Sequence, residues 1–228
     1  MTLSPEEMIA AIKGKLIVSC QAYPGEPLRE PHITAMMAKA VVEGGAAAVR
    51  VQGIEDIKAT AQAVDVPVVG LWKDGHEGVY ITPTPAHAKA CVEAGAQIVA
   101  IDATDRPRPD GSTFADCVKA VKEANPNALV MADCSCVEDG IAAEKAGADF
   151  IGTTLAGYTP SREKTPGPDF ELIDQMLAAV SKPVIVEGRI HKPADLAAVM
   201  EKGAWSACVG TAITHPTSLT RWFIDAID

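Results

Sequence analysis

The sequence predicts an α/β protein with the (β/α)8 architecture of a TIM barrel. Four segments repeat the tail of a helix, a Gly-Ala corner and a short apolar strand, with corner glycines at Gly45, Gly95, Gly147 and Gly203. Glycine suits the left-handed backbone conformation that closes a helix. Successive corners lie roughly 50 residues apart, which is too long for one βα unit, so a second strand is expected between neighbouring copies.

Apolar runs at 16–20, 66–72, 128–133 and 182–187 fill those gaps. Together with the four repeats they make eight strands, separated by segments of helical periodicity such as 33–44 and 170–180. This alternation is typical of a parallel sheet with right-handed crossovers, closed into a single barrel domain over residues 1–228. A doubly wound open sheet is the alternative, but no G-x-G-x-x-G follows the first strand.

A short helix is predicted ahead of the first strand. Ser4 is its N-cap, Pro5 its first residue and Glu7 the third position of a capping box. The same N-terminal stretch lacks the basic and apolar regions of a signal peptide, and no apolar run reaches the length of a membrane span. We therefore expect a cytoplasmic protein without a membrane-spanning segment.

Composition excludes several classes of partner. The formal net charge of −10 disfavours nucleic acid and anionic membranes, yet a local cluster of cations and backbone amides can still hold a small phosphorylated ligand. Aromatic residues make up only 4% of the chain, so Ala, Val and Ile must fill the core. The six cysteines are scattered through apolar segments, which indicates buried, reduced thiols rather than disulfides.

Two ionisable residues stand at strand ends, where a TIM barrel carries its chemistry. Burial near Arg50 or Arg189 would lower the pKa of Lys73 toward the range of a proton acceptor, although a lysine in a solvated turn is the alternative. Burial would raise the pKa of Glu187 and favour a proton donor. The alternative for Glu187 is a structural ion pair with Arg189 or Arg50.

Other strand-end residues suggest an anion site but no metal. Asp102 and Asp133 could together hold a divalent cation or orient the lysine. The histidines fall at no ligand spacing, and Cys134 and Cys136 lack a second pair, so we predict no metal. The loops after the seventh and eighth strands are the usual phosphate site of this fold, and they are predicted to bind phosphate through Gly188, Arg189, Gly210 and Thr211.

The ordered motifs resemble the N-acetylmannosamine-6-phosphate 2-epimerase family of bacterial sialic acid and amino sugar catabolism. The resemblance spans nearly the whole chain and rests on LIVSCQA, AVRVQG, YITPT, IDAT with RPRPDG, MADCS, TTLAGYT, VEGRI and VGTAIT. It implies a TIM-barrel homodimer that interconverts N-acetylmannosamine 6-phosphate and N-acetylglucosamine 6-phosphate without a cofactor.

The resemblance also implies roles for particular residues. The catalytic pair falls on Lys73 and Glu187. The predicted substrate-binding set consists of Gln21, Arg50, Asp133, Thr153, Gly188, Arg189, Gly210, Thr211 and His215. Family members commonly have arginine in an AITRP segment where this chain has AITHP, so His215 stands in place of that arginine.

The chemistry fits these residues. Inverting C2 of the ring-opened sugar removes a proton next to a carbonyl and returns one on the other face, which calls for a base and an acid. Which of Lys73 and Glu187 addresses which face is open. Three alternatives remain: a Schiff-base aldolase that uses the lysine, a metal-dependent epimerase acting at another carbon, and a sugar-phosphate binding protein without activity.

Overall fold

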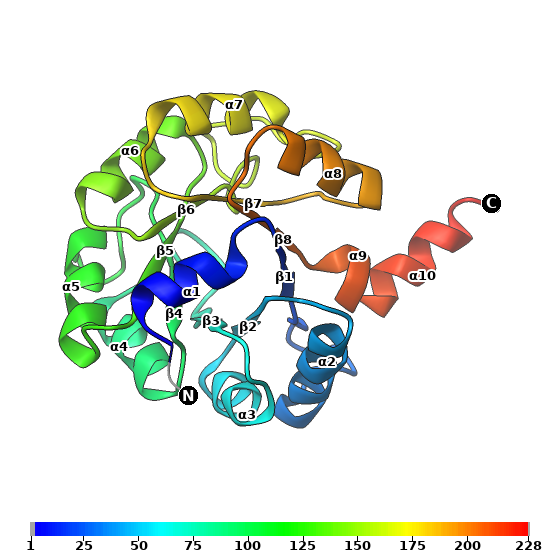
Figure 1. The fold of residues 1–228 in the computed structure, drawn as a ribbon, viewed down its shortest axis with the longest axis horizontal. Coiled ribbons are helices and arrows are strands. Elements are labelled where there is room, and N and C mark those ends of the chain that lie inside the picture. Colours follow the sequence, from blue (N-terminus) through cyan, green and yellow to red (C-terminus); the bar gives the residue numbers. More distant parts are fainter. Residues whose placement is uncertain (1–2, 228) are drawn as a thin grey trace.

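The computed structural model describes residues 3–227 as a closed barrel of parallel strands (Figure 1). The strands follow chain order around the barrel, and β1 pairs with both β2 and β8, which closes the sheet. They are β1 (Leu16–Ser19), β2 (Ala48–Gln52), β3 (Val68–Leu71), β4 (Ile98–Asp102), β5 (Leu129–Asp133), β6 (Phe150–Gly152), β7 (Val184–Glu187) and β8 (Ser206–Val209). The predicted (β/α)8 architecture is confirmed.

Each strand is followed by a helix. The helices are α1 (Pro5–Ile12), α2 (Pro31–Glu43), α3 (Ile54–Ala63), α4 (Pro85–Glu93), α5 (Phe114–Ala124), α6 (Val137–Lys145), α7 (Phe170–Ala179), α8 (Pro193–Glu201), α9 (Thr211–Thr214) and α10 (Pro216–Ile224). The four corner glycines have φ values of 101°, 109°, 98° and 98° in chain order. These left-handed values explain the repeated Gly-Ala corner, because a residue with a Cβ would be strained there.

Helix α1 closes the N-terminal end of the barrel, where Figure 1 shows it lying across the strands. Its buried residues Met8 and Ile12 pack with the apolar residues that fill the barrel interior. The predicted capping box is confirmed: the Glu7 amide donates to the Ser4 hydroxyl at 3.2 Å, and the Ser4 amide donates to the Glu7 carboxylate at 2.8 Å. The cap fixes where the plugging helix begins.

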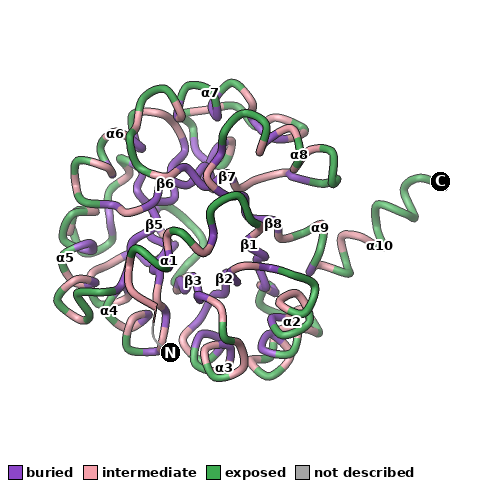
Figure 2. Tube along the Cα trace, in the orientation of Figure 1, coloured by how far each residue is buried: buried purple, intermediate pink, exposed green. Residues whose placement is uncertain are grey.

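Burial is concentrated in the strands and in the helix faces that cover them (Figure 2). Two apolar clusters fill the layer between strands and helices, one around β1 to β4 and the other around β6 to β8. All six cysteines are free thiols, five of them buried, in line with the predicted reduced state.

Helix α10 departs from this arrangement. It follows β8, yet it extends away from the barrel in Figure 1 and has no buried residue. Its apolar side chains Trp222, Phe223 and Ile224 are exposed. Among residues 3–227, no helix has both the length and the apolar content needed to cross a membrane.

Candidate active site

The period-two alternation of the strands places charged side chains inside the barrel. In β2, Ala48 belongs to the interior apolar cluster, so Arg50, two residues later, also points inward. The same alternation, continued past the strand ends, turns inward Gln21, Lys73, Asp102, Asp133, Thr154 and Glu187. A polar layer therefore lies directly on an apolar one, at the end of the barrel opposite α1.

Arg50 lies at the centre of this layer, with its side chain only 1% exposed. Its Nη1 and Nη2 donate to the two carboxylate oxygens of Asp133 at 3.0 and 2.6 Å, and Nη1 is also 3.0 Å from Oε2 of Glu187. Burial opposes the charge of Arg50, but the two carboxylates outweigh it and raise the arginine pKa. One cation thus neutralises part of two buried negative charges.

Glu187 is held through both its side chain and its backbone. The Thr153 hydroxyl donates to the Glu187 carbonyl at 2.9 Å and accepts from the Glu187 amide at 3.1 Å. Burial raises the pKa of the Glu187 carboxyl, and Asp133 raises it further, while Arg50 lowers it. The net shift is upward, so this carboxyl holds a proton more readily than an ordinary glutamate.

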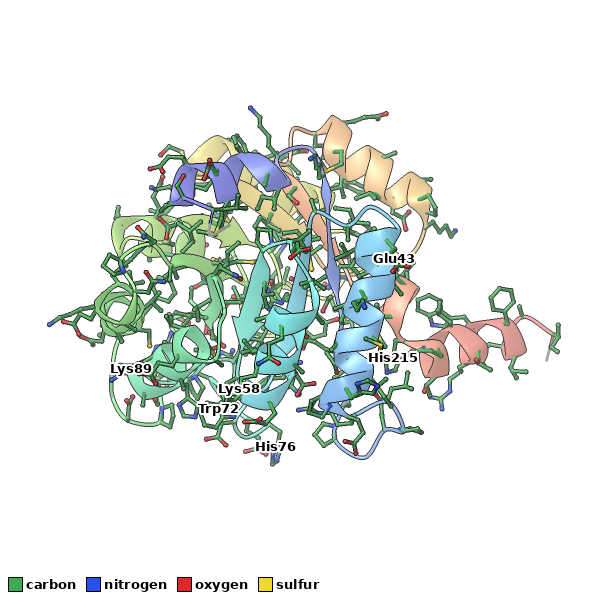
Figure 3. All side chains as sticks on the ribbon, turned by 60° about the horizontal axis from the view of Figure 1, so that its bottom comes forward. Glu43, Lys58, Trp72, His76, Lys89 and His215 are labelled. Atoms are coloured by element: carbon green, nitrogen blue, oxygen red, sulfur yellow. The ribbon has the colours of Figure 1, made fainter. Side chains whose placement is uncertain are left out.

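Lys73 lies just beyond β3, in the segment that also contains Trp72 and His76, both of which are labelled in Figure 3. An antiparallel bridge with Ile81 fixes its backbone. Burial, followed by the charge of Arg50, lowers the pKa of Lys73 from 10.5 to about 8. Its ammonium forms no salt bridge within residues 3–227 and lies 5.5 Å from the centre of the Tyr23 ring.

Lys73 and Glu187 line one cavity of about 240 Å³ at the mouth of the barrel. Gln21 also lines it, with its Nε2 donating to Ser19 at 2.9 Å. The Oε1 of Gln21 is buried and has no hydrogen-bond partner among the described residues. An amine with a lowered pKa, a carboxyl with a raised pKa and the Gln21 side chain therefore line the same space.

The loops after β7 and β8 form one wall of the cavity. Within the described chain, the backbone N–H groups of Gly188, Arg189 and Gly210 donate to no protein acceptor. Gly188 has a φ of 124°, and Arg189 has a φ of 55°, a conformation that costs a non-glycine residue free energy and clusters at functional sites. The backbone here presents several donors to the cavity, as a phosphate site requires.

The Arg189 side chain has a structural role beside this wall. Its guanidinium donates to the Ala156 carbonyl at 2.8 Å, the Gly167 carbonyl at 3.0 Å and the Thr165 hydroxyl at 3.0 Å. These bonds hold the loop between β6 and α7 and fix the unusual backbone of Arg189. The alternative ion pair between Glu187 and Arg189 does not form, whereas the one with Arg50 does.

His215 lies where the barrel meets α10 and is labelled in Figure 3. Its Nε2 is 2.7 Å from a Glu26 carboxylate oxygen, and its Nδ1 is 2.7 Å from the Ser218 hydroxyl. It also lines the cavity, with Tyr23 packed edge-on against its ring. Both ring nitrogens thus have protein partners, and His215 links the loop after β1 to α10.

Three predicted substrate-binding residues do not line the cavity. Arg50, Asp133 and Thr153 lie behind it. Arg50 pairs with the Glu187 carboxylate, Thr153 hydrogen-bonds to the Glu187 backbone, and Asp133 holds Arg50. The predicted site residues did not include Thr154, which lines the cavity and whose hydroxyl lies 3.3 Å from the Glu187 carboxylate. Side chains alternate along a strand, so with Phe150 of β6 pointing into the barrel, Thr154 also points inward and Thr153 points outward.

Asp102 also lies outside the cavity lining. It is fully buried, and its carboxylate accepts bonds from Thr104 at 2.6 Å and Arg106 at 2.6 Å. Burial raises the pKa of this carboxyl. No group of three or more His, Cys, Asp or Glu side chains among residues 3–227 could hold a metal ion.

Comparison with known proteins identifies the family. The family model for NanE, described as "Putative N-acetylmannosamine-6-phosphate epimerase", matches residues 34–228. Proteins named "Putative N-acetylmannosamine-6-phosphate 2-epimerase" from Cutibacterium acnes and Caldanaerobacter subterraneus are 53% and 49% identical to this chain. The first alignment covers 97% of both chains, and the second covers 97% of this chain and 94% of the relative.

A solved structure gives the same result. The N-acetylmannosamine-6-phosphate 2-epimerase from Clostridium perfringens superposes with a TM-score of 0.92 at 42% identity, covering 96% of each chain. Sequence and fold thus agree over almost the whole length. The chain belongs to the NanE family of N-acetylmannosamine-6-phosphate epimerases.

Proposed function

We propose that this protein is a carbohydrate epimerase that interconverts N-acetylmannosamine 6-phosphate and N-acetylglucosamine 6-phosphate. Membership of the NanE family supports this substrate pair. The observation that carries the mechanism is the pair of opposite pKa shifts in one cavity: downward for Lys73 and upward for Glu187. Such divergent shifts are how a site supplies a base and an acid near neutral pH.

The reaction exchanges one proton at C2 of the ring-opened sugar. One of the two residues removes the proton next to the C1 carbonyl, and the other supplies a proton to the opposite face. The roles exchange when the reaction runs backward. Carbon keeps its oxidation state throughout, so the reaction calls for no redox cofactor.

The phosphate binds away from the reacting carbon in this proposal. The amides of Gly188, Arg189 and Gly210, with the start of α9 at Thr211, receive it, while Gln21 contacts the sugar. Because the phosphate does not react, its binding energy positions C2 between the acid and the base. His215 contributes through its contact with the loop that carries Gln21 and Tyr23.

Proton NMR of N-acetylmannosamine 6-phosphate in D2O with the enzyme tests the proposal. We expect deuterium at C2 together with a new signal of the glucosamine configuration. Product that keeps its original C2 proton would contradict exchange with solvent, and absence of product would contradict the proposed reaction. The unphosphorylated sugar is the matched control, and it should react far more slowly because it lacks the anchoring group.

The depressed pKa of Lys73 also suits a nucleophilic amine, so a Schiff-base lyase is the second candidate. Borohydride reduction in the presence of the sugar phosphate separates the two. We expect no covalent adduct, because proton transfer leaves the amine free. A mass increase on a peptide containing Lys73 would instead establish the Schiff base.

We also propose that the protein is a cytoplasmic homodimer that acts in the catabolism of sialic acid and other amino sugars, as the family resemblance implies. The exposed apolar side chains of α10 support the dimer, with Phe223 78% exposed and Trp222 38% exposed. A second copy would cover this surface. Sedimentation equilibrium should give twice the chain mass, and the substitution Phe223→Asp should weaken the association.

A further inference from the structure

One hydroxyl group lies between the two carboxylates of the site. Oγ1 of Thr154 is 2.7 Å from Oδ1 of Asp133 and 3.3 Å from Oε2 of Glu187. A threonine hydroxyl has a single hydrogen and can donate to only one of them at a time. The shorter distance indicates that it donates to Asp133 and turns a lone pair toward Glu187.

Arg50 treats the two carboxylates unequally. Its Nη1 is 3.0 Å from both, but Nη2 donates to Asp133 alone at 2.6 Å. With the Thr154 hydroxyl, Asp133 accepts three hydrogen bonds from these two residues, whereas Glu187 faces the shared Nη1 of Arg50 and the Cys208 thiol, which is a weak donor. Hydrogen bonds to the ionised form of a carboxyl favour that form, so Asp133 is the better stabilised anion.

Two neighbouring carboxylates that share one cation do not both stay ionised easily, and a proton between them settles on the less stabilised one. That carboxyl is Glu187. A proton on its Oε2 would point at the Thr154 oxygen, which completes a chain from Glu187 through Thr154 to Asp133. Glu187 also lines the cavity, whereas Asp133 does not.

We infer that Thr154 is a positioning residue that directs the shared proton to Glu187, the carboxyl facing the substrate, and keeps Asp133 ionised behind it. This inference rests on the proposed epimerase reaction, in which Glu187 gives and takes the proton at C2. Without the hydroxyl, the proton would no longer be confined to the carboxyl that reaches the sugar.

The backbone makes room for this arrangement. A Cβ at Gly152, two residues earlier on the same face, would lie 3.3 Å from the Thr154 hydroxyl oxygen and 2.7 Å from a Met131 side-chain carbon. The lack of a side chain at Gly152 therefore leaves space in which the hydroxyl can stand between the carboxylates.

Thr154→Val tests the inference, because valine has the shape of threonine without the hydroxyl. We expect kcat to fall by about tenfold or more, as for loss of part of a general acid–base device, with KM changed less than about twofold. The limb of the pH profile that reports Glu187 should move to lower pH, since the protonated carboxyl loses its acceptor. Thr154→Ser keeps the hydroxyl and should restore both kcat and the profile.

A titration that does not depend on activity separates this inference from the proposed function. The carboxyl carbon of Glu187 can be followed by 13C NMR against pH in the free enzyme, with Glu187→Gln to assign the signal. We expect the Glu187 pKa to fall in Thr154→Val and to recover in Thr154→Ser. An unchanged or raised pKa would overturn the inference, whereas an inactive wild-type enzyme with the expected titration would overturn only the epimerase reaction.

Discussion

The two ends of the barrel differ completely although the same strands build both. At the N-terminal end, Met8 and Ile12 of α1 plug an apolar interior. At the opposite end the interior holds Arg50, Asp133 and Glu187, with Lys73 above them. In β5 the change takes two residues, from Met131 to Asp133, and in β7 from Ile185 to Glu187.

This difference separates stability from chemistry. Full burial of a Met or Ile side chain contributes roughly 1.5–3 kcal/mol, so the plugged end stabilises the fold. A buried ion cluster brings little net stability, because desolvation offsets most of the attraction between the charges. The charged end instead supplies the shifted pKa values that acid–base catalysis needs. We therefore expect substitutions at the two ends to have opposite signatures.

The strongest test of the comparison is removal of the acid and the base. Lys73→Ala and Glu187→Ala should each lower kcat by about a thousandfold or more, since general acid–base groups contribute factors of this order. Both variants should still bind the phosphorylated sugar and unfold at a temperature close to that of the wild type. Calorimetry gives binding and unfolding. A variant with near wild-type kcat would remove its residue from the proposed mechanism.

Removal of Arg50, the cation shared by Asp133 and Glu187, should lower stability even though Arg50 lies at the charged end of the barrel. Arg50→Met leaves Asp133 and Glu187 buried without their counter-charge, which should lower the free energy of unfolding by about 3–5 kcal/mol. Denaturant titration at neutral pH measures it. The triple variant with Asp133→Asn and Glu187→Gln is the control and should regain most of the loss. A loss below about 1 kcal/mol would mean that the carboxylates are far better solvated than their burial indicates.

The plugged end should show the reverse signature. Ile12→Ala deletes a fully buried side chain and should lower the free energy of unfolding by about 2–5 kcal/mol. The kcat of the folded enzyme should not change, because Ile12 lies at the end away from the cavity. Glu6→Ala on the exposed face of the same helix is the matched control, with an expected effect within about 0.5 kcal/mol. A fall in kcat for Ile12→Ala would show that the two ends are coupled.

The sequence was sufficient for the features that depend on local pattern. The left-handed glycines, the capping box at Ser4 and the eight strands follow from short-range chemistry, and all are present. The charged side chains that point into the barrel could also be found from the period-two alternation along each strand. The lower pKa of Lys73 was predicted from burial and from a nearby arginine, and both causes operate.

Features that depend on contacts between distant strands were not accessible in this way. Arg50 and Asp133 are 83 positions apart in the chain, and no local pattern indicates that they pair beneath the cavity. The choice between Thr153 and Thr154 depends on which face of β6 points into the barrel, and the structure settles it by placing Phe150 in the interior. The course of α10 away from the barrel was equally hidden, since its sequence has ordinary helical features.

The smallest effect we predict concerns pH, and it links the charged end to both stability and rate. The pKa of Lys73 is lowered to about 8, so between about pH 8 and 10.5 the unfolded chain binds more protons at this lysine than the folded one. The contribution of Lys73 to the free energy of unfolding therefore rises with pH between about pH 8 and 10.5. Below about pH 8 this contribution is constant and destabilises the fold. The limb of the kcat/KM profile that reports Lys73 should lie near pH 8, because Lys73 must be neutral to act as the base. The 13Cε shift of Lys73, assigned with Lys73→Met, should titrate at the same pH, and a titration near 10.5 would show that the amine is solvated as at an ordinary surface.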